Sequence, residues 1–216
     1  VELVVVKSNP LVKRKISLIV YDFDGTLVDT LFDIADAVNL SLSELGLRTL
    51  SRETICKYVG KGVERLMDQS IKGTGCADLP LAVEFFLKFY SENLMNHTRF
   101  YPYGREILDH FRDKKQAICS NKPEDFVRRI LVSLESQDLF DAILGGDSLK
   151  SKKPDPEGLL YLLDRFQCPP EQAVLIGDSP VDIETGKRAG VYTCVVSFGF
   201  GDPREMALTE PDCSVD

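Results

Sequence analysis

The stretch SLIVYDFDGTLVDT, residues 17–30, decides the fold. Its apolar start is typical of a short buried strand, which stops at two carboxylates, Asp22 and Asp24, followed by Gly25 and Thr26. In an extended segment residues i and i+2 point to the same side, so both acids can face one volume. Like charges this close cost free energy unless a cation lies near them, and two hard oxygen ligands suit Mg²⁺. The stretch predicts a strand that ends at a magnesium site; the alternative is an Asp-rich turn that caps the strand.

Similar apolar, β-branched runs recur along the chain, with helical patterns between them. They lie at residues 16–22, 116–120, 141–146, 173–178 and 191–197. Short buried strands separated by amphipathic helices predict an α/β fold with a doubly wound, Rossmann-like parallel sheet. In such sheets ligands bind outside the carboxyl ends of the strands. The polar residues at these ends are Asp22, Asp24, Ser120, Asn121, Asp147 and Asp178.

A segment with helical rather than strand-like hydrophobic periodicity separates the first two core strands. Residues 31–97 carry a helical stripe and a second helix-rich run at 79–95, with no comparable strand run between them. The stripe consists of Ile34, Val38, Leu42 and Leu45. The segment is too long for an ordinary crossover helix, so we predict an inserted α-helical cap domain above the carboxylates. The α/β core then comprises residues 1–30 and 98–216. Within it, residues 1–15 form an extension, an edge strand or a basic linker, to which we assign no function.

Composition and charge narrow the class of protein. At 216 residues and 44% hydrophobic, the chain can bury a substantial core. A net charge of −8 argues against general binding to nucleic acid or to an anionic membrane, so an anionic ligand would need local cations. No apolar run approaches the roughly 18 residues that cross a bilayer, and a cytoplasmic location is expected. The six cysteines lack metal-site spacing and are expected to be reduced thiols. The sequence leaves a monomer or a homodimer open.

A second motif is AICSNK, residues 117–122, at the end of the next core strand. A hydroxyl from Ser120, an amide from Asn121 and Lys122 stand there, next to backbone N–H groups at the start of the helix that Pro123 opens. Such a corner can bind an anion. The alternative is that Ser120 only caps the helix.

A third motif is SKKPDPEGLL, residues 151–160. A lysine before Pro-x-Pro at a helix start, Lys153, can project a fixed positive charge into a site. Read alone, the segment is equally typical of a solvated charged turn.

The fourth motif is LIGDSPVDIETGKRAG, residues 175–190. Asp178 ends a buried strand, and Asp182 follows one helical turn later on the same side. Asp178 can give the metal a third carboxylate, and Asp182 can hold a metal-bound water or position Lys153. The alternative is a helix N-terminus that favours acids for its dipole alone.

Taken in order, YDFDGTL, CSN, KKPDP and GDSPVD resemble the four motifs of the haloacid dehalogenase-like hydrolase superfamily, over residues 16–212. Within the superfamily the sequence looks most like the phosphoglycolate phosphatases. The resemblance implies a helical cap at the position of residues 31–97. It also implies phosphoryl transfer rather than dehalogenation, because displacement of a halide needs no acid at Asp24.

Roles for individual residues come with the resemblance. It implies that Asp22 is the nucleophile that forms an aspartyl-phosphate, that Asp24 is the general acid and base, and that Ser120 contacts the phosphoryl group. Lys153 would pair with that group and with Asp22. The metal residues would be Asp22, Asp24 through its backbone carbonyl, and Asp178; Asp182, which would act through a metal-bound water, is the candidate already taken from the fourth motif.

The segment Gly60-Lys61-Gly62 resembles the cap loop that touches substrate, with Lys61 able to meet a carboxylate; a plain helix-linking turn is the alternative. Asn121, beside Ser120, is a further candidate for substrate binding.

The expected activity is Mg²⁺-dependent hydrolysis of a small anionic phosphomonoester, with 2-phosphoglycolate as the first candidate substrate. Alternatives on the same core are a pyrophosphatase, a sugar-phosphate phosphatase or a phosphomutase. A catalytically silent binding protein is a further alternative, and the presence of Asp22, Asp24, Lys153 and Asp178 argues against it.

Overall fold

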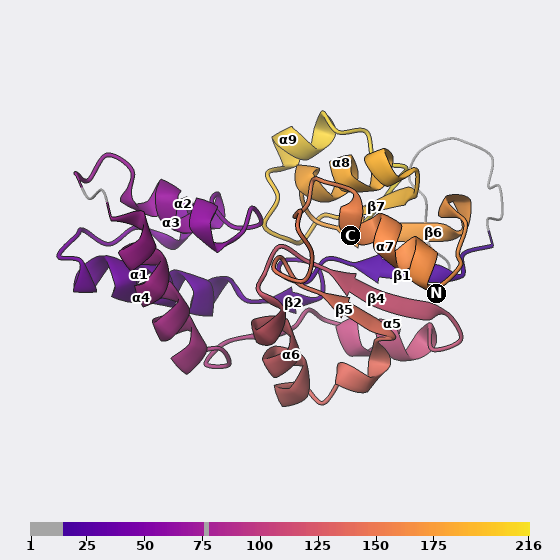
Figure 1. Ribbon diagram of the computed structural model, residues 1–216, viewed down its shortest axis with the longest axis horizontal. Helices are drawn as coiled ribbons and strands as arrows, with labels where there is room; N and C mark the ends of the chain where they lie inside the picture. The colour runs from indigo at the N-terminus through magenta and orange to yellow at the C-terminus, as the bar shows by residue number, and fades with distance from the viewer. Residues whose placement is uncertain (1–14, 76–77) are drawn as a thin grey trace.

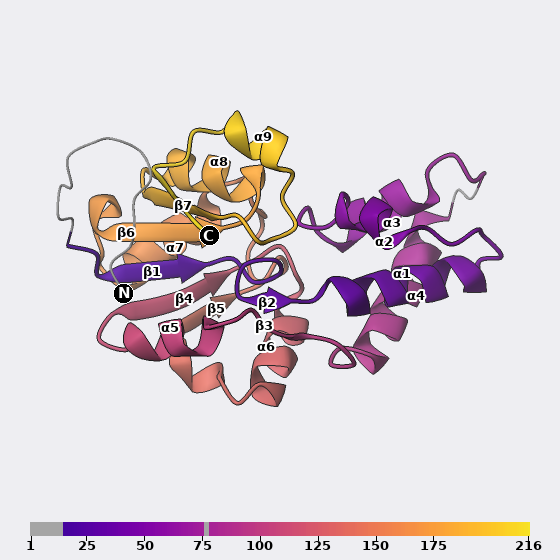
Figure 2. The same ribbon diagram turned by 180° about the vertical axis from the view of Figure 1, so that it is seen from behind.

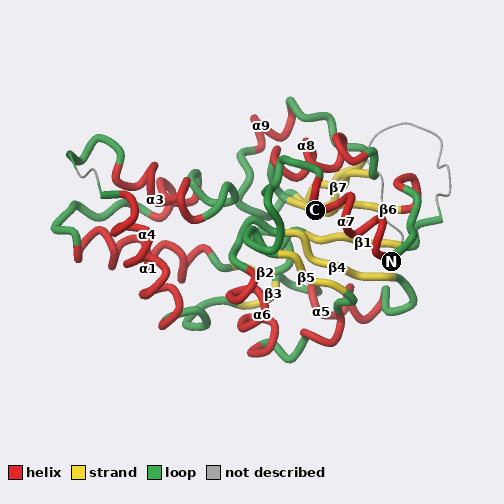
Figure 3. The backbone as a smooth tube through the Cα atoms, in the orientation of Figure 1, coloured by secondary structure: helices red, strands yellow, loops and turns green. Residues whose placement is uncertain are grey.

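A six-stranded parallel sheet forms the centre of the computed structural model, which describes residues 15–75 and 78–216. Its strand order is β5-β4-β1-β6-β7-β8, and every adjacent pair is parallel. Figure 3 shows β5, β4, β1, β6 and β7 side by side. The strands are β1 (Leu18–Tyr21), β4 (Lys115–Cys119), β5 (Ala142–Leu144), β6 (Ala173–Gly177), β7 (Tyr192–Val196) and β8 (Cys213–Val215). The chain leaves β1 toward β4 on one side and later returns to β6 on the other. A crevice forms where the strand order reverses in this way.

The register of the central strands aligns their carboxyl ends. Tyr21, the last residue of β1, lies opposite Ile118 of β4 and Ile176 of β6. All four residues of β1 are buried, as expected for a strand covered on both faces. The polar residues that follow these strands therefore emerge at nearly the same level.

Helices cover both faces of the sheet. Ile19 and Tyr21 belong to the cluster that includes residues of α5 (Gly104–His110) and α6 (Glu124–Ser133). Leu18 and Val20 belong to the other cluster, which includes residues of α7 (Glu157–Arg165) and α8 (Pro180–Ala189). The remaining helices of the core are α9 (Pro203–Ala207) and the 3₁₀ turns η1 (Gln137–Leu139) and η2 (Pro170–Gln172). Alternation of side chains along β1 thus gives each face its own apolar layer, and the predicted α/β doubly wound core is confirmed.

Four helices lie beyond the carboxyl edge of the sheet, away from both layers (Figure 1 and, from behind, Figure 2). They are α1 (Leu31–Glu44), α2 (Arg52–Cys56), α3 (Val63–Ile71) and α4 (Leu79–Glu92). Ile34, Val38 and Leu42 of the predicted stripe are buried on α1, which packs against α4. This is the inserted helical cap of the predicted fold class.

The neck between cap and core is a two-stranded antiparallel sheet, β2 (Val28–Asp29) and β3 (Arg99–Phe100). Asp33, at the start of α1, accepts hydrogen bonds from the backbone N–H groups of His97 and Thr98 at 3.0 and 2.9 Å. The chain entering the cap is therefore tied to the chain leaving it. The predicted boundaries fall directly before α1 and just before β3.

The sequence pattern did not indicate β2, β3 or β8, because strands of two or three residues are too short to show a period. The possible edge strand near the N-terminus lies outside the described residues. In the described part of the chain, no helix combines the length and apolar character needed to cross a membrane.

Candidate active site

Four charged residues from separate loops meet at the carboxyl edge of the sheet. Asp22 follows β1, Lys153 lies in the loop after β5, Asp178 follows β6, and Asp182 occupies the first turn of α8. The Lys153 ammonium (Nζ) lies 2.8 Å from Asp22 Oδ1 and 2.6 Å from Asp182 Oδ1. All four side chains are buried. We call these residues, Asp22, Lys153, Asp178 and Asp182, the core cluster.

Two glycines let the backbone approach this cluster. Gly25 has φ +81°, and a Cβ atom there would lie 2.3 Å from Asp178 Oδ2. A Cβ atom on Gly177 would lie 2.3 Å from Asp182 Cγ. Both distances are far shorter than a van der Waals contact, so any side chain at either position would displace a carboxylate.

Burial controls the protonation of the core cluster. It raises the pKa of Asp22 to about 6, although Lys153 acts in the opposite direction. It also raises the pKa of Asp178 to about 8, and the neighbouring charges of Asp182 and Asp22 add to the effect. Burial alone would lower the pKa of Lys153, but the carboxylates of Asp182 and Asp22 outweigh it and raise that pKa. The cluster holds three carboxyl groups and one ammonium, which contacts Asp22 and Asp182, so ionisation of all three leaves an excess of negative charge that a divalent cation would neutralise.

The hydrogen bonds distinguish the carboxylates that could hold a metal. Ligand oxygens of Asp22, Asp178 and Asp182 lie within 4.8 Å of one another. Asp182 uses Oδ1 for Lys153 and Oδ2 for the backbone N–H and hydroxyl of Ser179, at 3.1 and 2.6 Å. Asp22 commits Oδ1 to Lys153 and to the N–H of Phe23. Asp178 accepts from the N–H of Phe200 at Oδ2 (2.6 Å) and from the Thr26 hydroxyl at Oδ1 at a longer 3.4 Å. Asp22 and Asp178 therefore each keep an oxygen without a short contact among the described residues and could hold Mg²⁺, whereas both oxygens of Asp182 have short contacts.

Ser120 and Asn121 follow β4 and are both buried beside the core cluster. The amide of Asn121 donates to the carbonyl oxygens of Lys153 and Gly60, each at 2.9 Å. Asn121 therefore links the Lys153 loop to the cap. Ser120 Oγ accepts a 3.4 Å hydrogen bond from the N–H of Lys122, a contact that fits the helix-cap alternative as well as an anion corner.

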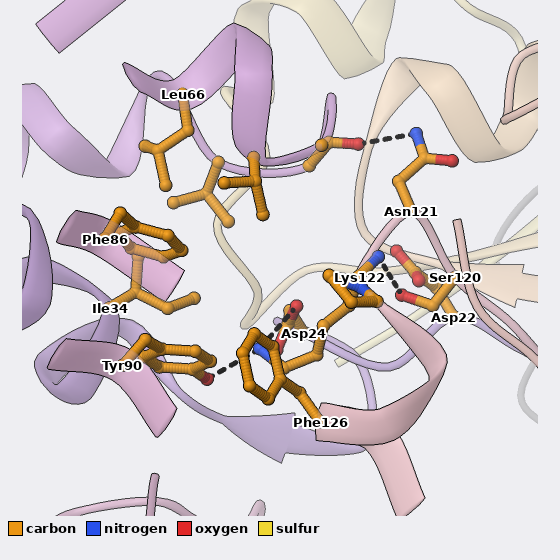
Figure 4. Close-up of a pocket in the computed structure, with 15 residues that line it drawn as sticks. Asp22, Asp24, Ile34, Leu66, Phe86, Tyr90, Ser120, Asn121, Lys122 and Phe126 are labelled. Carbon is orange, nitrogen blue, oxygen red and sulfur yellow. Dashed lines mark hydrogen bonds and ion pairs between the residues drawn. The ribbon is translucent and has the colours of Figure 1, made fainter. Parts of the chain in front are cut away.

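A second charged group joins the core to the cap. Lys122 Nζ lies 3.0 and 3.2 Å from the two carboxylate oxygens of Asp24, and it donates to the Tyr90 hydroxyl of α4 at 2.6 Å (Figure 4). We call Asp24, Lys122 and Tyr90 the bridging cluster. Burial lowers the pKa of Lys122, and the charge of Asp24 only partly opposes this effect. The sequence placed Lys122 at the strand end but gave it no role, and nothing in the sequence pattern indicated Tyr90.

Two hollows between cap and core adjoin these clusters. The smaller, with a volume of about 40 Å³, meets Asp24, Ser120 and Lys122 on the core side. Its cap side is mostly apolar, with Ile34, Val63, Leu66 and Phe86 among its residues. The larger, a cleft of about 540 Å³, reaches Lys153 and Asp178. Gly60 lines both hollows.

The residues of the predicted cap loop, Gly60 to Gly62, line different hollows. Gly62 lines the smaller one, and the exposed Lys61 lines the cleft. Lys57 and Arg65 lie in the same cleft, and these three are the only charged side chains that the described part of the cap contributes to its lining. The cap thus presents positive charge toward the core cluster even though the chain as a whole carries a net charge of −8.

Comparison with known proteins places this geometry in a family. A family model described as "Haloacid dehalogenase-like hydrolase" matches residues 19–196. A phosphoglycolate phosphatase of Nitrosospira multiformis is 38% identical over 205 residues, which cover 92% of this chain and 89% of that protein. One from Aquifex aeolicus is 38% identical over 85% of each chain.

Among solved structures, a predicted phosphoglycolate phosphatase from Haemophilus somnus superimposes with a TM-score of 0.88. It is 31% identical in sequence, over 94% of this chain and 95% of its own. The resemblance seen in the motifs is confirmed: the protein is a phosphoglycolate phosphatase-like hydrolase and belongs to the haloacid dehalogenase-like hydrolase family.

Proposed function

We propose that the protein is a Mg²⁺-dependent phosphomonoesterase that hydrolyses 2-phosphoglycolate to glycolate and phosphate through an aspartyl-phosphate on Asp22. The observation that carries this proposal is the ion pair of buried Asp22 with Lys153 at 2.8 Å, beside Asp178 and Asp24. A carboxylate is a weak nucleophile toward a phosphate dianion unless nearby cations reduce the repulsion. Lys153 supplies one such cation inside the buried site.

In the first step an oxygen of Asp22 attacks phosphorus, and the bond between phosphorus and the leaving oxygen breaks. Asp24 donates its proton to that oxygen, so glycolate leaves as an alcohol rather than as an alkoxide. Lys153 pairs with the phosphoryl oxygens, and the Ser120 hydroxyl donates a hydrogen bond to them.

In the second step water attacks the same phosphorus, and Asp24, now a carboxylate, takes a proton from it. The bond between phosphorus and Asp22 breaks, which releases phosphate and restores both carboxyl groups. Asp182 keeps Lys153 in place throughout, because its two oxygens are fixed by Lys153 and by Ser179.

Asp22 and Asp178, with the backbone carbonyl of Asp24, would hold Mg²⁺, which when bound supplies positive charge that offsets the negative charge on the transferring phosphoryl group. This assignment accounts for a buried cluster of three carboxyl groups and one ammonium, which pairs with only two of them.

The charge that the cap contributes to the cleft supports an anionic substrate. The cap contributes Lys57, Lys61 and Arg65 to the cleft, and these attract anions. The carboxylate of glycolate would meet these cations, and relatives that match most of this chain are named phosphoglycolate phosphatase. We therefore place 2-phosphoglycolate ahead of sugar phosphates.

The cytoplasmic location and the monomeric or homodimeric state remain predictions from the sequence.

Asp22→Asn tests the mechanism directly. We expect it to lower Mg²⁺-dependent phosphate release by about 10⁴-fold or more, because the nucleophile is lost. The matched control is Asp36→Asn, the same change at an exposed position on α1, which should retain wild-type activity. Undiminished hydrolysis by Asp22→Asn would rule out the aspartyl-phosphate route, and an inactive wild-type protein would favour a binding protein.

The substrate is tested by comparing kcat/KM for 2-phosphoglycolate, pyrophosphate, glucose 6-phosphate and a generic ester. We expect 2-phosphoglycolate to be the best of the four. If it is no better than the generic ester, the assignment of substrate is wrong while the chemistry stands.

A further inference from the structure

We propose that Lys122 and Tyr90 are positioning residues that hold Asp24 in line with the leaving oxygen, so that the cap takes part in aligning the acid. The inference rests on the proposed function, in which Asp24 is the proton donor. It concerns two residues outside the core cluster, one of which belongs to the cap.

The carboxyl group of Asp24 is held from two sides. Lys122 Nζ contacts both of its oxygens, at 3.0 and 3.2 Å, and the Thr30 hydroxyl donates to Oδ1 at 2.7 Å. The side chain of Lys122 is 4% exposed and that of Asp24 is 12% exposed, so water competes little for these contacts. Together the two contacts fix the orientation of a carboxyl group that could otherwise rotate.

Tyr90 fixes Lys122 in turn. Its hydroxyl lies 2.6 Å from Lys122 Nζ, and its ring centroid lies 4.4 Å from the same atom. The ring stacks on Phe86 of the cap and meets the edge of Phe126 on α6 of the core. Tyr90 is therefore in place only when α4 lies against the core, which makes the position of Lys122 depend on the cap (Figure 4).

The contacts of Lys122 separate this role from that of Lys153. Among the described residues, the ammonium of Lys122 pairs with Asp24 and Tyr90, whereas that of Lys153 pairs with Asp22 and Asp182. One lysine therefore serves the nucleophile and the other serves the acid. A proton donor that is misplaced by about 1 Å can lose about 100-fold in rate, so the second lysine has a measurable effect on catalysis.

Esters with different leaving groups show whether Asp24 is correctly placed to donate its proton. When the bond between phosphorus and an alkyl oxygen breaks, the electron pair stays on that oxygen, which takes the proton from Asp24. A p-nitrophenolate leaves without needing that proton. The parameter kcat/KM covers only the steps up to departure of the leaving group, so it is insensitive to the later hydrolysis of the aspartyl-phosphate.

The experiment compares kcat/KM for 2-phosphoglycolate, n-propyl phosphate and p-nitrophenyl phosphate in wild type, Lys122→Met and Tyr90→Phe. For Lys122→Met we expect a loss of about 100-fold on both alkyl esters and a much smaller loss on p-nitrophenyl phosphate. For Tyr90→Phe, which keeps the ring, we expect the same pattern at about 2- to 10-fold, the value of one hydrogen bond. Lys122→Arg should recover part of the loss, and Tyr58→Phe, elsewhere in the cap, is the matched control.

Several results would overturn the inference. An equal loss on all three esters would assign Lys122 to the phosphoryl group or to folding, and thermal unfolding of each variant separates those two cases. A loss confined to 2-phosphoglycolate would make Lys122 a contact for the substrate carboxylate. Wild-type rates in both variants would remove the role altogether. Failure of the proposed function gives a different result, because then Asp22→Asn would hydrolyse the esters as well as wild type does.

Discussion

The two charged clusters of the site are built differently. The core cluster takes three members from loops at the edge of one sheet and Asp182 from the first turn of α8, and its lysine faces two carboxylates. The bridging cluster takes Asp24 and Lys122 from the core and Tyr90 from the cap, and its lysine faces one carboxylate. At Lys153 the carboxylates of Asp182 and Asp22 outweigh burial and raise the pKa, whereas at Lys122 burial outweighs Asp24 and the weaker effects of Asp22 and Asp33, so the pKa is lowered. All members of the first cluster belong to the core, whereas the second includes a residue of the cap.

The largest effect should come from removing the ammonium of the core cluster. Lys153→Met leaves Asp22 and Asp182 buried without their cation, so we expect the free energy of unfolding to fall by about 3–5 kcal/mol. Phosphate release should fall by about 10³-fold or more. Denaturant unfolding and kcat measure the two effects, and both should exceed those of Lys122→Met, which deprives only one carboxylate of its partner.

Lys152→Met is the matched control, one residue away. Lys152 pairs with Glu64 of the cap at 2.8 Å, but both side chains are well exposed, so removing this pair should cost less than about 1 kcal/mol. If the two variants lose equal stability, the contrast between a buried and an exposed lysine at this site is wrong.

The next effect links Mg²⁺ to pH. Because burial raises the pKa of Asp22 to about 6 and of Asp178 to about 8, the folded protein keeps protons that the unfolded chain has released. Without metal, the contribution of these two groups to stability is therefore fully present below the ordinary carboxyl pKa of 3.8 and is lost as pH rises toward 8. Mg²⁺ binds the ionised carboxylates, so at about 100 times its Kd it should add about 2.7 kcal/mol at pH 8, and less at pH 5 where protons compete.

Thermal unfolding in EDTA and in MgCl₂ between pH 5 and pH 8 measures this linkage. Asp178→Asn should remove most of it. Tyr90→Phe should leave it unchanged, because Tyr90 belongs to the bridging cluster. If Tyr90→Phe changes the gain in thermal stability that Mg²⁺ gives, the two clusters are coupled and do not act independently.

A smaller effect tests how closely the backbone confines the core cluster. Gly25 and Gly46 both have positive φ, but only at Gly25 would a Cβ atom meet other atoms, the nearest being Asp178 Oδ2 at 2.3 Å. Gly46→Ala should therefore cost about 1 kcal/mol of backbone strain, and Gly25→Ala about 2 kcal/mol or more with weaker Mg²⁺ binding. Denaturant unfolding and Mg²⁺ titration measure both. If both variants lose the same free energy of unfolding, Asp178 can move aside freely and the backbone does not confine the core cluster.

The sequence predicted the elements that carry a strong period and the positions where they end. The five core strands, the helical cap and the polar residues at the strand ends all follow from apolar runs and their spacing. The pattern did not indicate β8 or the neck strands, because they are too short to carry a period and form only when a neighbouring strand supplies hydrogen bonds.

Residues 22, 120 and 178 could be brought together from sequence alone, because parallel strands end at one edge of their sheet and the motifs mark those ends. The family resemblance implied that Lys153 pairs with Asp22, and the fourth motif suggested its contact with Asp182, but nothing in the sequence indicated that Lys122 pairs with Asp24. Lysine side chains are long enough to reach several carboxylates. Which carboxylate each lysine contacts therefore depends on how the loop of Lys153 and the helix of Tyr90 pack. The pairing of Lys122 with Tyr90, 32 residues away, exists only because α4 of the cap lies against the core. The sequence by itself determined the chemistry available at the sheet edge, and the tertiary structure decided how that chemistry divides between a core cluster and one that the cap completes.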